Sequence, residues 1–209
     1  MSTKGVAAAV AAQVAFGLKA HSGWAALVVI GRSDDGYRVV DRRRIELVGP
    51  HDQWAKQPYH AAEEKEPSTA EKLVTRGIEI ARKAALSEVR SAIERCREQG
   101  LSIAACAVLV PAPMPRWSVA EILAVHFRMH KAEGVMFPEA LAKAVVECRL
   151  PLFSIRESGL GDEAGRVLTT PPGRLTTQVA QLGKSVGAPW GKDQKDATLA
   201  AMIALRGSH

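Results

Sequence analysis

The sequence predicts an α/β domain whose mixed five-stranded sheet is flanked by helices. The start of the chain holds three apolar, strand-like runs joined by short turns. A long segment with helical periodicity follows, then a continuous apolar run, and further helical segments enclose a short fifth run. Strands joined by short turns pair antiparallel, and strands joined through a helix pair parallel. We therefore expect three antiparallel strands followed by two parallel ones.

Length and composition indicate one folded domain. The chain has 209 residues, 47% of them hydrophobic and 24% charged, with a formal net charge of +6. These values are typical of globular proteins and argue against disorder. We expect a single domain over residues 1–206, and we exclude residues 207–209 from functional reasoning as a remnant of cloning.

Cysteine usage and hydropathy indicate a cytoplasmic protein. Cys96, Cys106 and Cys148 lack the spacing of a disulfide framework or a cysteine zinc site, so we expect reduced thiols. No run of 18 apolar residues lacks a charge, so no transmembrane helix is expected. The alanine-rich residues 1–14 have no clear processing site, and we interpret them as the lead-in to the first strand rather than a signal peptide.

The first three strands are expected at residues 10–18, 24–30 and 37–48. Asp and Gly in residues 33–36 tolerate the positive φ angles of a hairpin turn. Residues 49–67 contain three prolines and an acidic run, which predicts a long surface loop.

A long helix and a buried strand form the middle of the chain. Ser68 and Glu71 have the spacing of a capping box, and Gly100 is a natural terminator, which predicts a helix over residues 68–99. Its apolar residues recur every three or four positions. The apolar run at residues 101–110 is typical of a strand buried on both faces beside parallel neighbours.

The remaining elements are mostly helical. Prolines at 111, 113 and 115 predict an extended loop, and Ser118 can cap a short helix that ends near residue 126. The expected elements after it are a helix at 134–148 that Pro138 could interrupt, a strand at 151–155, a polar, glycine-containing stretch at 158–170, and helices at 174–185 and 193–205.

Two local patterns accompany this order of elements. Residues 17–24 read GLKAHSGW, and residues 193–197 read DQKDA. With the order of elements over nearly the whole chain, they resemble the ribonuclease H-like superfamily, in outline its branch of RuvC-type Holliday junction resolvases. The first pattern is similar to the strand-to-turn segment that opens such domains, and the second to the paired acids of the final helix. Residues 187–195 also resemble bacterial proteins of unassigned function.

The resemblance implies a carboxylate cluster that holds two divalent metals, with acids from the first strand, the fourth strand or its vicinity, and the last helix. This sequence departs from that pattern. Lys19, or Ala20 after a shift of one, stands at the first-strand position, and residues 108–111 contain no acid. Asp193 and Asp196 remain, three residues apart on one helical face. The catalytic acids are therefore interpreted as degenerate.

The departure at Lys19 leads to a sharper hypothesis. We expect Lys19 to lie opposite Asp193 or Asp196, so that an internal ion pair takes the place of the metal.

Histidines form other candidate sites. His21 lies at the carboxyl end of the first strand, and His60 lies in the long loop. On a continuous helix His126, His130 and Glu133 share one face, without the order of an HExxH motif. Three interpretations stay open for that group: a structural polar cluster, an imidazole–carboxylate pair for proton transfer, and a metal site.

The first quarter of the chain is biased toward basic residues, including the triplet at residues 42–44. This bias indicates either a solvated strand edge or a strip that binds phosphates. No P-loop, GxGxxG or GxSxG motif stands in the required context, so these nucleotide-binding and hydrolase classes are excluded.

The main functional hypothesis is a noncatalytic or divergent ribonuclease H-like protein that binds nucleic acid or a protein partner, with a homo-oligomer as an option. The candidate ligand-binding residues are Lys19, His130, Lys195, Arg42 and Arg44.

The alternative is a hydrolase or nuclease dependent on Mg²⁺ or Mn²⁺, with a rearranged carboxylate–histidine site. Its candidate catalytic residues are Asp193, Asp196, Glu133 and His21. A small-molecule binder, with its ligand at the carboxyl ends of the strands, is a third hypothesis.

Overall fold

The structure is a computed structural model that describes residues 11–34 and 36–208. Several sequence-based expectations lie outside these residues: most of the lead-in before the first strand, the predicted strand start at Val10, Asp35 of the hairpin turn, and His209.

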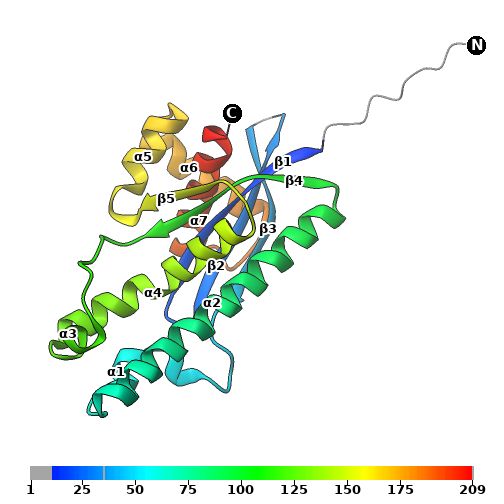
Figure 1. Ribbon diagram of the computed structural model, residues 1–209. Coiled ribbons are helices and arrows are strands. Elements are labelled where there is room, and N and C mark those ends of the chain that lie inside the picture. The colour runs from blue at the N-terminus through cyan, green and yellow to red at the C-terminus, as the bar shows by residue number, and fades with distance from the viewer. Residues whose placement is uncertain (1–10, 35, 209) are drawn as a thin grey trace, which may run out of the picture.

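One five-stranded sheet forms the centre of the molecule, with the strand order β3-β2-β1-β4-β5 (Figure 1). The strands are β1 (Ala12–His21), β2 (Trp24–Ser33), β3 (Gly36–Glu46), β4 (Leu101–Val110) and β5 (Leu152–Arg156). The β1–β2 and β2–β3 pairs are antiparallel, and the β1–β4 and β4–β5 pairs are parallel. The predicted fold class, with three antiparallel and two parallel strands, is confirmed.

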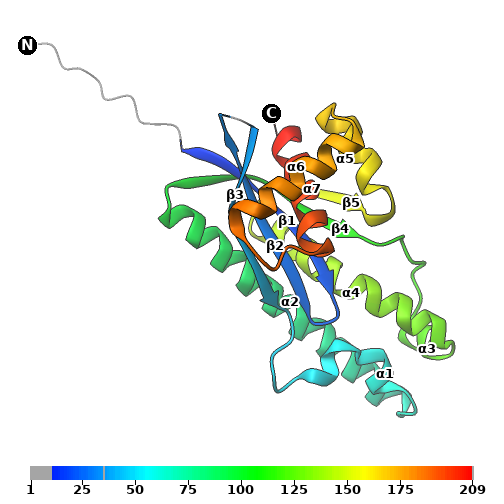
Figure 2. The ribbon, with the colours of Figure 1, turned by 180° about the vertical axis from the view of Figure 1, so that it is seen from behind.

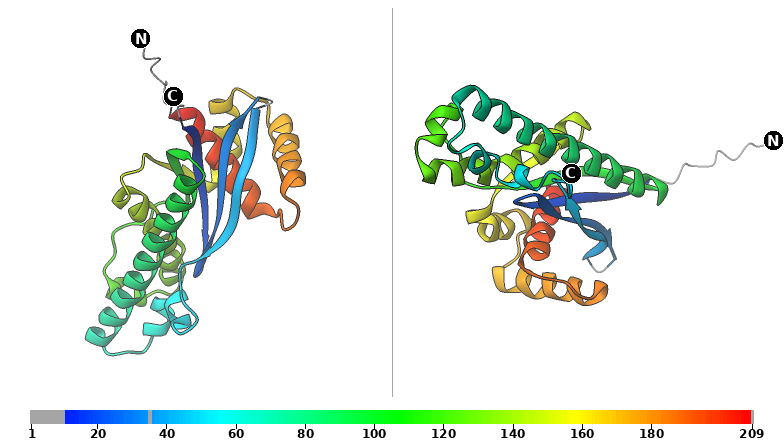
Figure 3. Two further views of the ribbon diagram at one scale, coloured as in Figure 1. Left: turned by 90° about the vertical axis from the view of Figure 1, so that its right-hand side faces the viewer. Right: turned by 90° about the horizontal axis from the view of Figure 1, so that it is seen from below.

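Helices cover both faces of the sheet, which separates two apolar cores. On one face pack α2 (Pro67–Glu98) and α4 (His126–Glu147). On the other face pack α5 (Leu160–Leu168), α6 (Pro172–Val186) and α7 (Lys192–Gly207). Figure 2 shows α6 and α7 in front of the sheet, and the left view of Figure 3 shows the two helical layers on opposite sides of it.

The period of two along β1 decides which side chains meet α7. Val14, Phe16 and Leu18 belong to the core under α2 and α4, whereas Ala15 belongs to the core under α7. Successive side chains of a strand point to opposite faces. The odd-numbered residues Lys19 and His21 therefore face the start of α7.

Short elements fill the segment that was expected to be a plain loop. Residues 49–66 contain a 3-10 helix, η1 (Gln53–Lys56), and α1 (Pro58–Ala62). Tyr59 and Ala62 of α1 join a third apolar cluster with residues of α2, of α4 and of α3 (Val119–Leu123). This cluster fixes α1 beside the start of α4.

Several predicted boundaries need correction. The helix α2 begins at Pro67, with Glu66 as its N-cap, so Ser68 is not a cap. Residues 158–170, expected to be irregular, contain η2 (Glu157–Gly159) and α5, because Leu160 and Ala164 stand one turn apart and are buried with residues of α7. The helix α4 runs unbroken through Pro138, whose neighbours Phe137 and Leu141 are fully buried.

The predicted cap at Ser118 is confirmed, and Ser118 forms a capping box with Glu121. Its hydroxyl accepts a hydrogen bond from the backbone N–H of Glu121, whose carboxylate accepts one from the backbone N–H of Ser118. Among the described residues, no helix combines the length and apolar character needed to cross a membrane.

Close approach of β1 and α7 requires glycine at position 17. A Cβ atom built on Gly17 would lie 1.8 Å from the carbonyl oxygen of Ala197. Neither backbone can move without disturbing the core, because Phe16, Leu18 and Ala197 are all fully buried.

We predict that Gly17→Ala lowers the free energy of unfolding by about 3 kcal/mol or more, because it overpacks the contact between strand and helix. The control is Gly134→Ala, since Gly134 is exposed within α4 and has open space around it. That change should be neutral or stabilise by up to about 1 kcal/mol. Chemical denaturation measures both, and equal stability of the two variants would contradict the close contact.

Candidate functional site

Five polar side chains converge where the carboxyl ends of β1 and β5 meet the amino end of α7. Lys19 and His21 come from β1, Glu157 directly follows β5, and Asp193 and Asp196 lie in the first two turns of α7. We call these five residues the carboxylate cluster. Four of them were singled out from the sequence, and Glu157 was missed.

The ammonium group of Lys19 occupies the middle of the cluster. Its Nζ donates a hydrogen bond to Asp196 Oδ2 at 2.8 Å. The same atom lies 3.5 Å from Glu157 Oε2 and 4.0 Å from Asp193 Oδ1. Only 9% of the Lys19 side chain is exposed. The ion pair expected between Lys19 and an acid of the last helix is therefore present, with Asp196 as the direct partner.

The carboxylates keep Lys19 charged despite its burial. Burial alone would lower the pKa of Lys19. The hydrogen bond to Asp196 and the negative charges of Asp196, Glu157 and Asp193 outweigh burial, and the pKa is raised above its ordinary value. Burial would likewise raise the pKa of Asp196, but its bonds to Lys19 and Lys192 outweigh this effect and lower it.

An aromatic and basic surface adjoins the cluster. The rings of His21 and Trp24 stack with centroids 4.4 Å apart, and His21 Nε2 lies 3.0 Å from Asp193 Oδ1. The Arg44 guanidinium lies 4.1 Å from the centre of the Trp24 ring. Lys192, whose side chain is 80% exposed, pairs with Asp196 from the solvent side.

The three arginines at residues 42–44 each make different contacts. Arg42 donates hydrogen bonds to the backbone carbonyls of Val186, Ala188 and Pro189, and so fixes the segment that leads into α7. Its assignment as a ligand-binding residue is therefore corrected, because its guanidinium is used within the fold. Arg43 pairs with Asp41.

Of the remaining ligand-binding candidates, Arg44 is half exposed and pairs with Glu46, and Lys195 is exposed in α7. Arg44 adjoins the carboxylate cluster through Trp24 and His21, and Lys195 directly precedes Asp196 in the chain, so both stay candidates for binding a ligand.

Glu133 and His130 lie outside the carboxylate cluster. Glu133 contacts Tyr59 and His60 of α1, and His130 contacts His126, all within the helical layer on the opposite face of the sheet. The alternative hypothesis required Glu133 to share one site with Asp193, Asp196 and His21. This convergence is wrong, because α4 and α7 cover different faces.

Sequence reasoning missed Glu157 as a site residue and missed the meeting of His60 with the histidines of α4. Glu157 directly follows the last residue of β5, and its position after a parallel strand was a usable signal. His60 joins His126 and His130, but no spacing in the sequence relates residues so far apart.

The residues of the carboxylate cluster do not fit a two-metal centre. Three carboxylates offer the oxygen ligands that Mg²⁺ and Mn²⁺ prefer. The Lys19 ammonium, however, is bonded to one of these carboxylates and stands within 4.0 Å of the other two. A divalent ion among these oxygens would have to displace it.

No family model matches the sequence, and no curated protein matches it either. Several solved structures are similar to this chain. The complex of T. thermophilus RuvC with a Holliday junction substrate is 13% identical and covers 91% of both chains, with a TM-score of 0.50. The fold is ribonuclease H-like. Thermus thermophilus RuvC alone has 14% identity over 91% of this chain and 92% of that chain, with a TM-score of 0.49.

The yeast mitochondrial Holliday junction resolvase Ydc2 is more distant, with 11% identity over 93% of this chain and 79% of that chain and a TM-score of 0.40. At these identities the similarity concerns the ribonuclease H-like fold, and the chemistry has to be argued from the side chains.

We predict that Lys19→Ala lowers the free energy of unfolding by about 3 kcal/mol, because it leaves the partly buried Asp196 carboxylate without its direct partner. The matched control is Lys192→Ala, which removes the exposed cation from the same Asp196 and should cost about 1 kcal/mol or less. Urea denaturation at neutral pH compares the two. Equal costs would mean that the buried pair contributes no more than a surface one.

The ion pair between Lys19 and Asp196 should also make the free energy of unfolding depend on pH. Since folding lowers the pKa of Asp196, its stabilisation is complete above the pKa of the unfolded chain, near 3.9, and is lost as the pH falls through the lower folded value. The stability difference between the wild type and Asp196→Asn should be constant from pH 5 to 8 and shrink below about pH 4. A difference that persists undiminished at pH 2 would contradict the assigned charge of Asp196.

Proposed function

We propose that this chain is a noncatalytic protein of ribonuclease H-like fold that binds nucleic acid, and that Lys19 stands where a catalytic metal would bind. The observation that carries the proposal is the position of the Lys19 ammonium among Glu157, Asp193 and Asp196.

The net charge of the carboxylate cluster argues against metal-dependent catalysis. Lys19 and Lys192 together leave the three carboxylates with one uncompensated negative charge. A divalent ion 4 Å from an ammonium is repelled by about 8 kcal/mol at an effective dielectric constant of 20. Two-metal catalysis needs two such ions close together to activate water and stabilise a leaving oxygen. The cluster has neither the charge nor the vacant position for them.

Charge and aromatic surface support a nucleic acid as the ligand. Partial neutralisation by Lys19 and Lys192 reduces the repulsion between the carboxylates and a phosphate backbone. Arg44 lies over the Trp24 ring, which stacks on His21, and Lys192 and Lys195 are exposed in the first turns of α7. Cations bind phosphates, and aromatic rings stack on bases. The formal net charge of +6 favours the same class of ligand. Thermus RuvC, which shares the fold, is described in complex with a Holliday junction.

A thermal-shift titration with Mn²⁺ and Mg²⁺ tests the metal-free assignment. The wild type should show no stabilisation by either ion. Lys19→Asp should gain it, because the change removes the ammonium and supplies a fourth carboxylate; at 100 times the dissociation constant the gain is about 2.7 kcal/mol.

Lys19→Met is the control, since it removes the charge without adding a ligand. If the wild type is stabilised by Mn²⁺ and Asp193→Asn abolishes the effect, the metal-dependent nuclease is the better assignment. If the Lys19→Asp variant folds but neither ion raises its melting temperature, the carboxylate cluster is not a former metal site.

Fluorescence anisotropy with single-stranded, duplex and four-way-junction DNA at two salt concentrations tests the ligand. Arg44→Ala combined with Lys192→Ala should weaken binding uniformly across sequences and lower the salt dependence by about one unit per lost phosphate contact. The matched control is Arg82→Ala with Lys83→Ala, which removes the same charge from the exposed side of α2. Equal weakening by both pairs, or no binding to any of these DNAs, would overturn the proposed surface.

A further inference from the structure

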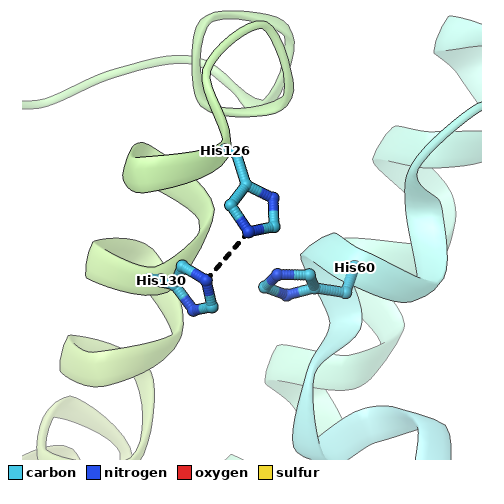
Figure 4. Close-up of side chains that lie close together, drawn as sticks. All are labelled: His60, His126 and His130. Carbon is cyan, nitrogen blue, oxygen red and sulfur yellow. Dashed lines mark hydrogen bonds between the residues drawn. The ribbon is translucent and has the colours of Figure 1, made fainter.

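Three histidines gather at the junction of α1 and α4, far along the sequence from one another. His60 comes from α1, and His126 and His130 come from the first two turns of α4. One ring nitrogen of each lies within 4.8 Å of the others, and the Nε2 atoms of His126 and His130 are 3.0 Å apart. Figure 4 shows the three rings turned toward a common point. We call these residues the histidine cluster.

Helix spacing and the packing of α1 bring the three rings together. His126 and His130 are four residues apart, so they occupy one face of α4. The neighbouring α1 is held close by a tight contact with α2, where a Cβ on Gly77 would lie 2.6 Å from Cβ of Pro58. Buried Tyr59 and Met129 belong to the same apolar cluster. His60 is therefore presented to the pair by packed elements.

A buried carboxylate orients His60. Glu133 is only 5% exposed, and its Oε1 accepts hydrogen bonds from the backbone N–H groups of Tyr59 and His60 at 3.1 and 3.2 Å. Its Oε2 lies 2.8 Å from Nδ1 of His60. A carboxylate in this position accepts a hydrogen bond from Nδ1–H, leaves the Nε2 lone pair for a metal, and makes the imidazole a stronger metal ligand. Glu133 is thus a positioning residue for the cluster.

We propose that the histidine cluster binds one Zn²⁺ ion through His60, His126 and His130, with water in the fourth position. Zn–N bonds of about 2.0–2.1 Å place tetrahedral ligands about 3.3 Å apart. The widest nitrogen separation, 4.8 Å, then closes by about 1.5 Å. Rotation of the exposed His126 and His130 rings supplies this movement. Three imidazoles select zinc and its neighbours over Mg²⁺ and Ca²⁺, which prefer oxygen ligands.

The site is independent of the carboxylate cluster. It lies on the other face of the sheet and takes a different class of metal, so its failure would leave the assignment of Lys19 untouched. The bound ion would join α1 to α4 and tie residues 53–62 to the helical layer.

Untagged protein, stripped with chelator and dialysed, tests the proposal by isothermal titration with Zn²⁺. We expect one ion per chain and a rise in melting temperature. His126→Ala and His130→Ala should each weaken zinc binding at least about tenfold and abolish the rise. The matched control is His51→Ala, an exposed histidine outside the cluster, which should bind zinc as the wild type does.

Glu133→Gln tests the orienting role. It should weaken zinc binding by about 10- to 100-fold while all three ligands remain. Co²⁺ provides a second readout, because its visible absorption reports the coordination geometry, and we expect bands in the wild type that His130→Ala removes. The proposal is overturned if the wild type binds no zinc, or if His126→Ala and His130→Ala bind zinc as His51→Ala does.

Discussion

The contact between Lys19 and Asp196 joins the central strand to the first turns of α7, and the candidate site depends on it. Gly17 lets the α7 backbone approach β1 so closely that no side chain fits between them. Two residues further along the same face, Lys19 then lies within reach of the acids of α7 and of Glu157. An ammonium that is 9% exposed is tolerated only with such partners. Arg42 completes the arrangement, because it fixes the backbone that leads into α7.

The strand directions and the position of Lys19 could be predicted because both follow from short-range patterns. Short turns and a helical connection dictate strand directions, and alternation along β1 places Lys19 on the face that α7 covers. Other features depend on tertiary packing. The helix at residues 160–168 contains two glycines, which disfavour a helix, and its packing beside α7 through Leu160 and Ala164 outweighs them. Arg42 is a candidate ligand-binding residue from the sequence, but backbone carbonyls far along the chain accept its hydrogen bonds. The proximity of His60 and His130 likewise could not be predicted, because it depends on how α1 packs against α4.

The two polar clusters place different chemistry on opposite faces of one sheet. The carboxylate cluster contains hard oxygen ligands, but the Lys19 ammonium already pairs with them. The histidine cluster contains borderline nitrogen ligands, and its one carboxylate, Glu133, orients a ring instead of facing the centre. The ribonuclease H-like fold therefore positions side chains here without dictating their reaction, and at the carboxylate cluster the Lys19 ammonium makes the site an ion-pair network.

The central claim is that the Lys19 ammonium takes the place of a metal among Glu157, Asp193 and Asp196. Crystals of the wild type soaked in Mn²⁺, with anomalous diffraction recorded, test it most directly. We predict no anomalous peak between these carboxylates and a Lys19 side chain that still bonds to Asp196. A manganese peak in the cluster, with Lys19 turned away, would contradict the account and favour metal-dependent catalysis.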